Sequence, residues 1–158
     1  MGKVTYPENF KVVVLEPPTT TNGALTSECI SLKNANMVWV EFVFKQAASH
    51  ETVCYLYEST AVGSSGNVIT ETMPIWKNAD IDTTDTLVRG TDAATVTLTA
   101  GATDQHVVMQ FDPAKFTSGY DCLYAYTSAS SQGTNYATIH AVIDTKYKSD
   151  VPPAAITD

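Results

Sequence analysis

An all-β fold, more closely an antiparallel and jelly-roll-like β-sandwich, is predicted by three features of this 158-residue sequence. Threonine accounts for 23 residues, and β-branched side chains fit the pleated surface of a sheet. Short apolar or alternating runs recur along the chain, separated by turn-forming residues. No amphipathic helix longer than about two turns is evident. Regularly spaced short strands of this kind favour a sandwich or jelly roll over a βαβ fold.

The first strands are defined by apolar runs and by the residues that interrupt them. Residues 10–15 form a β-branched run, which Pro17–Pro18 is expected to end because proline cannot donate a ladder hydrogen bond. After a turn-rich connection, residues 25–32 alternate as a half-buried strand does. Residues 37–45 are apolar on both faces except for Glu41, which predicts a central strand covered on two sides.

The second half of the chain continues the strand pattern. Tyr55 and Tyr57 fall on one face of an alternating segment. One helical turn is expected near residues 113–117, with Asp112 as its N-cap and Pro113 at its first position. Further strands are predicted at residues 68–70, 73–76, 86–89, 94–99, 106–111, 120–126 and 136–144.

The ends of the sequence differ from the middle. Residues 1–9 are polar and without periodicity, which predicts a flexible N-terminal arm. Residues 10–148 carry the strand pattern and are expected to form a single β-sandwich domain. Residues 149–158 contain two adjacent prolines and are expected to form a flexible C-terminal tail. There is no internal repeat to suggest a second domain.

Composition and charge exclude several classes of function. Hydrophobic residues make up 44% of the chain and charged residues 16%, so the chain is not of the disordered type. The formal net charge is −8, which argues against a nucleic-acid partner because gripping phosphates requires clustered Lys and Arg. No run of about eighteen apolar residues exists, so no membrane partner is expected. The residues after Met1 lack an apolar leader pattern, which predicts synthesis in the cytoplasm.

The cysteines show no metal-binding pattern. They are widely separated, and no pair has the Cys-x-x-Cys or Cys-x-x-His spacing that places two ligands on one metal. Each lies next to an apolar residue, where a thiol behaves as a small hydrophobe. Buried free thiols are therefore expected, with one disulfide or a reactive or metal-bound thiol as the alternatives. The three are Cys29, Cys54 and Cys122.

The sequence offers little support for catalysis, and no catalytic, cofactor or metal site is expected. His106 and His140 fall within strand patterns, and no Gly-x-Ser-x-Gly nucleophile motif exists. Asn78, Asp80 and Asp82 match the first positions of an EF-hand loop, but the required Gly and bidentate Glu are missing. A looser carboxylate site on this acidic loop, formed with Asp85, remains an alternative to a solvated loop.

Three further residues are considered for binding. Glu41 interrupts an apolar strand and is interpreted as a charge on the solvent side of that strand, although an inward carboxylate would be of catalytic interest. Trp39 lies in the most apolar strand and is expected in the core. Trp76, between a proline and the acidic loop, is the better candidate for an exposed contact.

A set of segments gives the chain a family resemblance. They are Ser31-Leu32-Lys33-Asn34 before the strand 37–44, Trp76-Lys77-Asn78-Ala79-Asp80 before Asp85-Thr86-Leu87, Phe111-Asp112-Pro113, Gly119-Tyr120-Asp121-Cys122-Leu123, and a strand ending near Lys146-Tyr147. On these segments, over roughly residues 25 to 148, the chain resembles virion structural proteins of tailed bacteriophages, of the capsid auxiliary or decoration type.

The resemblance implies a non-enzymatic β-sandwich that binds the outside of an assembled capsid. The implied partners are the major capsid protein lattice and further copies of the chain, with a trimer favoured, in a virion assembled in the host cytoplasm. The candidate interface comprises Tyr6, Pro7, Phe10, Val12, Val14 and Trp76, because an apolar arm and strand are suited to pairing with a neighbour's sheet. The alternative is a carbohydrate- or receptor-binding β-sandwich, with Trp76 and tyrosines as its platform.

Overall fold

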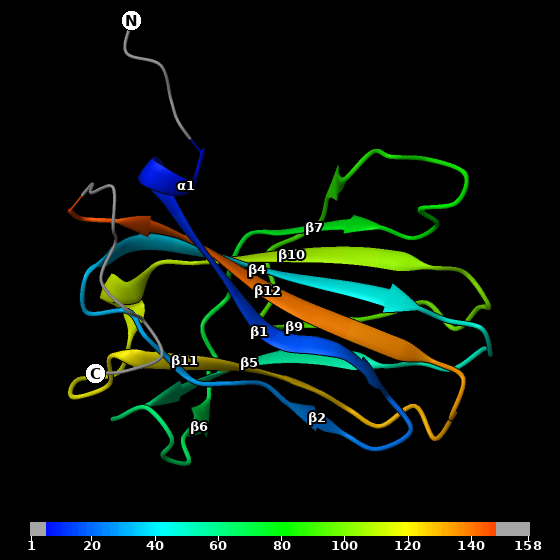
Figure 1. Ribbon diagram of the computed structural model, residues 1–158, viewed down its shortest axis with the longest axis horizontal. Coiled ribbons are helices and arrows are strands. Elements are labelled where there is room, and N and C mark those ends of the chain that lie inside the picture. The colour runs from blue at the N-terminus through cyan, green and yellow to red at the C-terminus, as the bar shows by residue number, and fades with distance from the viewer. Residues whose placement is uncertain (1–5, 148–158) are drawn as a thin grey trace, which may run out of the picture.

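Two antiparallel sheets form the molecule in a computed structural model that describes residues 6–147. Figure 1 shows the first sheet above and the second below. The first sheet has six strands, in the order β1 (Phe10–Thr20), β12 (Tyr136–Thr145), β4 (Ala35–Lys45), β10 (Gln105–Phe111), β7 (Ile75–Asn78) and β8 (Val88–Arg89).

The second sheet contains the remaining strands. Its main path runs β2 (Leu25–Thr26), β11 (Cys122–Thr127), β5 (Val53–Ser59) and β6 (Asn67–Val68). Two short strands complete it: β3 (Ile30–Ser31) also pairs with β11, and β9 (Thr95–Thr97) also pairs with β5. All of these ladders are antiparallel.

The connections are those of a jelly roll, which confirms the predicted fold class. Along the chain, β1, β4, β10 and β12 of the first sheet alternate with β2–β3, β5–β9 and β11 of the second. The resulting sheet orders, β1-β12-β4-β10 and β2/β3-β11-β5-β9, are those of two interlocked Greek keys. Residues 60–94, between β5 and β9, form an insertion that adds β6 to the second sheet and β7 and β8 to the first.

The core lies between the sheets and is built by strict alternation along the strands. In β4, Val38, Val40, Phe42 and Phe44 point inward and are buried. Leu56 of β5 and Leu123 of β11 are buried in the same cluster from the second sheet. Each large apolar side chain removed from water contributes about 1.5–3 kcal/mol, so this layer supplies most of the driving force for folding.

Three expectations about individual strands are wrong. Residues 25–32 form not one strand but two, β2 and β3, which residues 27–29 separate. β1 does not end before Pro17–Pro18 but continues to Thr20. The two prolines lie in a register shift of the β1–β12 ladder, between the pairs of Glu16 and Thr19, where an N–H is not needed. β4 packs against the core with one face only. On its other face, the side chains of Trp39, Glu41 and Val43 are half-buried within the described residues 6–147.

Helical structure is limited to two short turns in the described part of the chain. The 3₁₀ turn η1 (Pro113–Lys115) is at the predicted place, and the Asp112 carboxylate accepts a hydrogen bond from the Ala114 N–H at 2.9 Å. A four-residue turn, α1 (Tyr6–Asn9), occupies part of the expected arm. The remainder of that arm, residues 1–5, and the expected tail, residues 149–158, lie outside the described residues.

The three cysteines are buried free thiols, as expected. Cys54 points into the core between the sheets, where burial raises the pKa of its thiol well above the ordinary value. Cys29 and Cys122 belong instead to a small separate cluster that also contains Tyr124. Burial also raises the pKa of the Cys29 thiol. A thiol with a raised pKa is a poor nucleophile, so Cys29 and Cys54 act as packing groups.

We predict that Gly66→Ala destabilises the fold by about 1–3 kcal/mol, because a Cβ at residue 66 would overlap the main-chain carbonyl of Glu58. Gly23→Ala is the matched control, since a Cβ there has no neighbour within 4 Å. Urea unfolding of both variants measures the difference. Equal midpoints for the two variants would contradict the close packing of residue 66 against β5.

Candidate functional site

The outer face of the first sheet carries a continuous row of paired residues. Ladder partners across β1, β12, β4, β10, β7 and β8 place them side by side: Val14, His140, Glu41, Val108, Trp76 and Arg89. The neighbouring row is Val12, Val142, Trp39 and Gln110. We call the surface formed by these two rows, together with Tyr6, Phe10 and Leu87, the valine–aromatic face.

Aromatic rings extend this face toward the start of β1. The ring centroids of Tyr6 and Phe10 are 6.0 Å apart, and those of Phe10 and Trp39 are 6.1 Å apart with an edge-to-face tilt. The indole N–H of Trp39 donates to Gln110 Oε1 at 3.1 Å, which fixes the ring on the outside of the sheet. At the other end, the Arg89 guanidinium lies 5.0 Å from the Trp76 ring centre.

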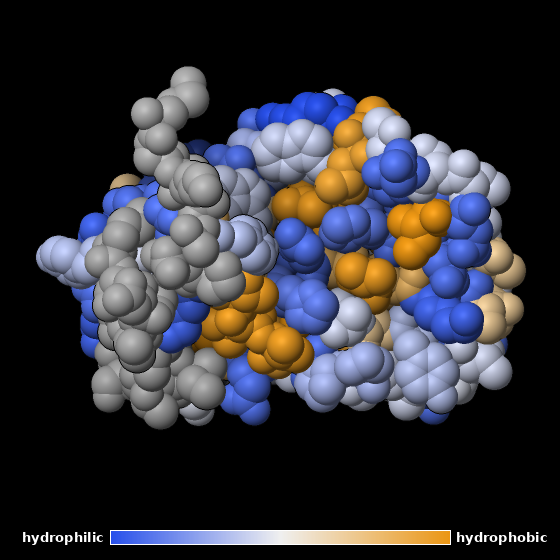
Figure 2. Space-filling view, turned by 45° about the horizontal axis from the view of Figure 1, so that its top comes forward, coloured by the Kyte–Doolittle hydropathy of each residue, from blue (hydrophilic) through white to orange (hydrophobic). Residues whose placement is uncertain are grey.

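The valine–aromatic face is exposed and hollowed within the described chain. The exposed fraction is 47% for Val12, 57% for Val14 and 54% for Tyr6. Groups of hydrophobic residues alternate with hydrophilic ones in the view of Figure 2. A depression of about 350 Å³ is lined by Tyr6, Phe10, Trp39, Glu41, Leu87, Val108 and Val142. Exposed apolar and aromatic residues grouped in this way are typical of interaction sites.

The structure gathers most of the predicted interface residues on this one face. Tyr6, Phe10, Val12 and Val14 lie at its β1 end, and Trp76 lies on β7 across the sheet. Pro7 belongs to α1, and its side chain is outside what the structure describes. These positions do not by themselves show binding.

Trp39 was missed as a surface residue, since it does not lie in the core as expected. It is half-buried on the valine–aromatic face. A signal was present in the sequence. Glu41 indicates which face of β4 points to solvent, and Trp39, two residues earlier, must point to the same face. The interpretation of Glu41 as a solvent-side charge is confirmed.

Glu41 is the charged centre of the face and lies between two histidines. Its carboxylate is 3.7 Å from His106 Nε2, and His140 is its ladder partner on β12. The proximity of His106, and the positive charge of either imidazole when it is protonated, lower the pKa of Glu41 below its ordinary value although partial burial acts the other way. The carboxylate therefore remains ionised under mildly acidic conditions.

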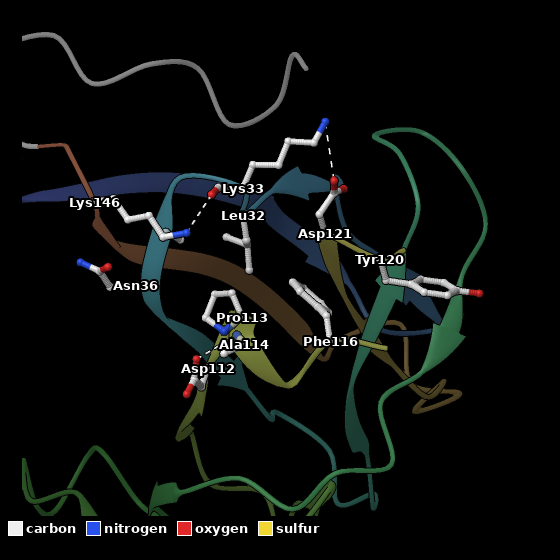
Figure 3. A pocket seen from close by; sticks show the side chains of 11 residues that line it. Leu32, Lys33, Asn36, Asp112, Pro113, Ala114, Phe116, Tyr120, Asp121 and Lys146 are labelled. Atoms are coloured by element: carbon white, nitrogen blue, oxygen red, sulfur yellow. Dashed lines mark hydrogen bonds and ion pairs between the residues drawn. The ribbon is translucent and has the colours of Figure 1, made fainter. Parts of the chain in front are cut away.

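A second hollow lies at one end of the sandwich (Figure 3) and holds about 340 Å³. Pro113 and Phe116 form an apolar floor beneath Leu32. Its charged side chains have partners within the chain: Lys33 pairs with Asp121 at 3.6 Å, and Lys146 Nζ donates to the Lys33 carbonyl at 3.1 Å. None of the described residues that line it is His, Cys or Ser.

Metal-binding geometry is not found in the described residues. No group of three His, Cys, Asp or Glu side chains converges there, the acidic loop of Asp80, Asp82 and Asp85 included. Asp80 instead accepts a hydrogen bond from the Asp82 N–H at 3.2 Å, as in a local turn. Over residues 6–147, no helix has the length and apolar character to cross a membrane.

Comparison with known proteins shows only distant structural similarity. The sequence matches no protein-family model and no curated protein. The SPBc2 prophage-derived protein YomS is similar at a TM-score of 0.46 and 11% identity, over 85% of this chain and 91% of YomS. A CBM4 structure is similar at a TM-score of 0.33 and 13% identity, over 86% of this chain and 68% of that chain. An oxalate oxidase is similar at a TM-score of 0.27 and 9% identity, over 94% of this chain and 57% of the oxidase. Similarities of this size say nothing about function.

We predict that Glu41→Gln lowers the melting temperature at neutral pH and that the difference from wild type disappears in acid. A carboxyl whose pKa is lowered by folding stabilises the fold at pH values above its pKa in the unfolded chain, which is near 4.5. This contribution is lost as the pH falls through the pKa that the carboxyl has in the folded protein. Melting curves from pH 7 to pH 3 measure this. Glu71→Gln, an exposed carboxylate in the β6–β7 connection, is the control. A difference that persists at pH 3 would contradict the assignment.

Proposed function

We propose that this β-sandwich is a structural virion protein that binds the outside of an assembled phage capsid through its valine–aromatic face. The observation that carries the proposal is this exposed apolar face, which no layer of the described chain covers. A partner surface would supply the missing cover. The sequence resemblance to phage auxiliary proteins supports the choice of a capsid as that partner.

The composition of the face supports protein binding rather than turnover. Valine and aromatic side chains offer rigid apolar area, and Trp and Tyr are the residues on which protein interfaces most often depend. Glu41 adds one ionised group at the centre of this area. Glu41 already lies beside His106 and His140, so a partner that covers it must preserve these contacts or supply a donor of its own, because an unpaired carboxylate in a dry interface is costly. The apolar area thus supplies affinity, and the carboxylate supplies register.

The position of β1 offers a second mode of contact. β1 forms one edge of the first sheet, and its sheet partner there is β12. An edge strand can accept a strand from a neighbour, which extends the sheet between molecules. The register shifts and Pro17–Pro18 spoil the later half of β1 for such pairing, so the contact is expected near Val12 and Val14.

Net charge and repetition fit an outer position. With a charge of −8 the protein is repelled by packaged DNA, which favours the outer surface of a shell over the interior. On a repetitive lattice, several weak contacts act together through effective concentration. A trimer around a local symmetry axis would present three such faces at once.

The presence of the protein in virions tests this function. Purified particles from the phage that encodes the chain are digested and analysed by mass spectrometry. The proposal expects the chain in a fixed ratio to the major capsid protein, and its loss from particles made without the gene. Absence from purified virions would overturn it.

We predict that Val14→Lys prevents co-sedimentation with capsids while leaving the free energy of unfolding within about 0.5 kcal/mol of wild type. The valine is 57% exposed, so the fold tolerates the lysine, but the interface would bury the new charge. Val68→Lys, on the second sheet and 39% exposed, is the matched control and should sediment normally. Equal co-sedimentation of both variants would exclude this face.

A further inference from the structure

The outer face of the second sheet carries four tyrosines in register. Tyr55 pairs with Tyr126, and Tyr57 pairs with Tyr124, across the β5–β11 ladder. The Tyr57 and Tyr124 rings stack at 5.0 Å between centroids, and the Tyr55 and Tyr126 rings meet edge-to-face at 5.8 Å. We call these four residues the tyrosine platform: Tyr55, Tyr57 and Tyr126 are half-buried and form its accessible part, whereas Tyr124 is only 9% exposed and supports Tyr57 from within.

Hydroxyl-bearing residues border the platform on both sides. Thr26 of β2 is the ladder partner of Tyr126, and Thr95 of β9 is that of Tyr55. One row across the sheet is therefore Thr26, Tyr126, Tyr55 and Thr95, a line of four hydroxyl groups with two aromatic rings at its centre. Hydroxyls of this kind both donate and accept hydrogen bonds.

A groove of about 350 Å³ leads off the platform beside Tyr124. Its walls are the residues around Glu28, on one side, and the loop of Ser64 and Ser65 on the other. The Gly66 N–H donates to the Tyr124 hydroxyl at 3.2 Å, which ties the loop to the platform. Only a residue without a Cβ can approach β5 this closely, so the glycine holds the groove in shape.

Within the described chain, the groove contains a single charged residue. Glu28 is the one ionisable carboxylate that lines the described groove, and no Lys or Arg does. Burial and the neighbouring phenols raise the pKa of Tyr57 above its ordinary value, so its hydroxyl stays protonated at physiological pH. A polyanion such as a nucleic acid or a sulfated glycan would find no cation in the groove.

We propose that the tyrosine platform and its groove bind a neutral glycan. The apolar C–H face of a sugar ring is attracted to the negative face of an aromatic ring, and the hydroxyls at the ring edge match those of Thr26, Thr95 and the serine loop. Glu28 adds an acceptor for a sugar hydroxyl. The groove volume lies within the range of small-ligand sites, ~300–1,000 Å³. A capsid protein as occupant would call for a larger and more apolar surface.

This site lies on the sheet opposite the valine–aromatic face, so it does not rest on the proposed capsid attachment. A protein fixed to a shell by one sheet would expose the other to the surroundings. The two proposals can therefore fail separately: Val14→Lys is expected to leave glycan binding unchanged.

Affinity gel electrophoresis of the full chain tests the proposal. Native gels are cast separately with dextran, galactomannan, arabinoxylan and a soluble β-1,3-glucan, and with heparin and hyaluronate as charged probes. Retardation is expected in at least one neutral gel and in neither charged gel. Migration unaffected by all four neutral polysaccharides would overturn the proposal, and so would retardation by the charged probes alone.

Variants locate the binding on the platform. The double variant Tyr57→Ala/Tyr126→Ala is expected to weaken retardation about tenfold or more, because two stacking rings are lost. Tyr57→Phe/Tyr126→Phe keeps the rings and the packing, and should lose only part of the binding. Tyr136→Ala, an equivalent change at an exposed tyrosine of the first sheet, is the control. If the Phe variant and the Ala variant were both retarded as strongly as wild type, the assignment of glycan binding to the tyrosine platform would be overturned.

Discussion

The alternation of β4 is the constraint on which the rest of the structure depends. Val38, Val40, Phe42 and Phe44 are buried between the sheets, and this burial fixes β4 at the centre of the first sheet. Because side chains alternate, the same constraint turns Trp39 and Glu41 outward. A slip of one residue in the register of β4 would bury a carboxylate and expose two phenylalanines. The packing of the core therefore also fixes which side chains of β4 lie on the outer surface.

Much of the fold could be predicted from local patterns, but the site could be predicted only in part. Most of the strand runs, the Asp112–Pro113 turn and the buried cysteines depend on residues close in sequence, and these expectations are confirmed, although the run 25–32 divides into β2 and β3. The course of β1 through Pro17–Pro18 depends on its register with β12, more than a hundred residues away, which no local pattern reveals. For the same reason the sequence could not show that Tyr55 faces Tyr126, since a cross-strand pair is set by the topology.

The sandwich presents two outer surfaces of different chemistry. The first sheet offers valines, tryptophans and a carboxylate held between His106 and His140. The second offers phenol and threonine hydroxyls with little charge. Both surfaces use side chains that the core does not need, since the alternate positions of each strand are already occupied by the packed interior. A single small domain can in this way face two environments without a hinge or a linker.

The insertion of residues 60–94 has a consequence for how such a protein can change over time. The eight strands of the jelly roll close without it, yet it delivers Trp76, Leu87 and Arg89 to the rim of the first sheet. Exchange of this one contiguous segment would change the rim of the first sheet, but it would also remove Ile69 and Met73 from the core between the sheets. A replacement segment must therefore supply new rim residues and two buried apolar side chains at the same time, which couples the variation of this surface to the packing of the interior.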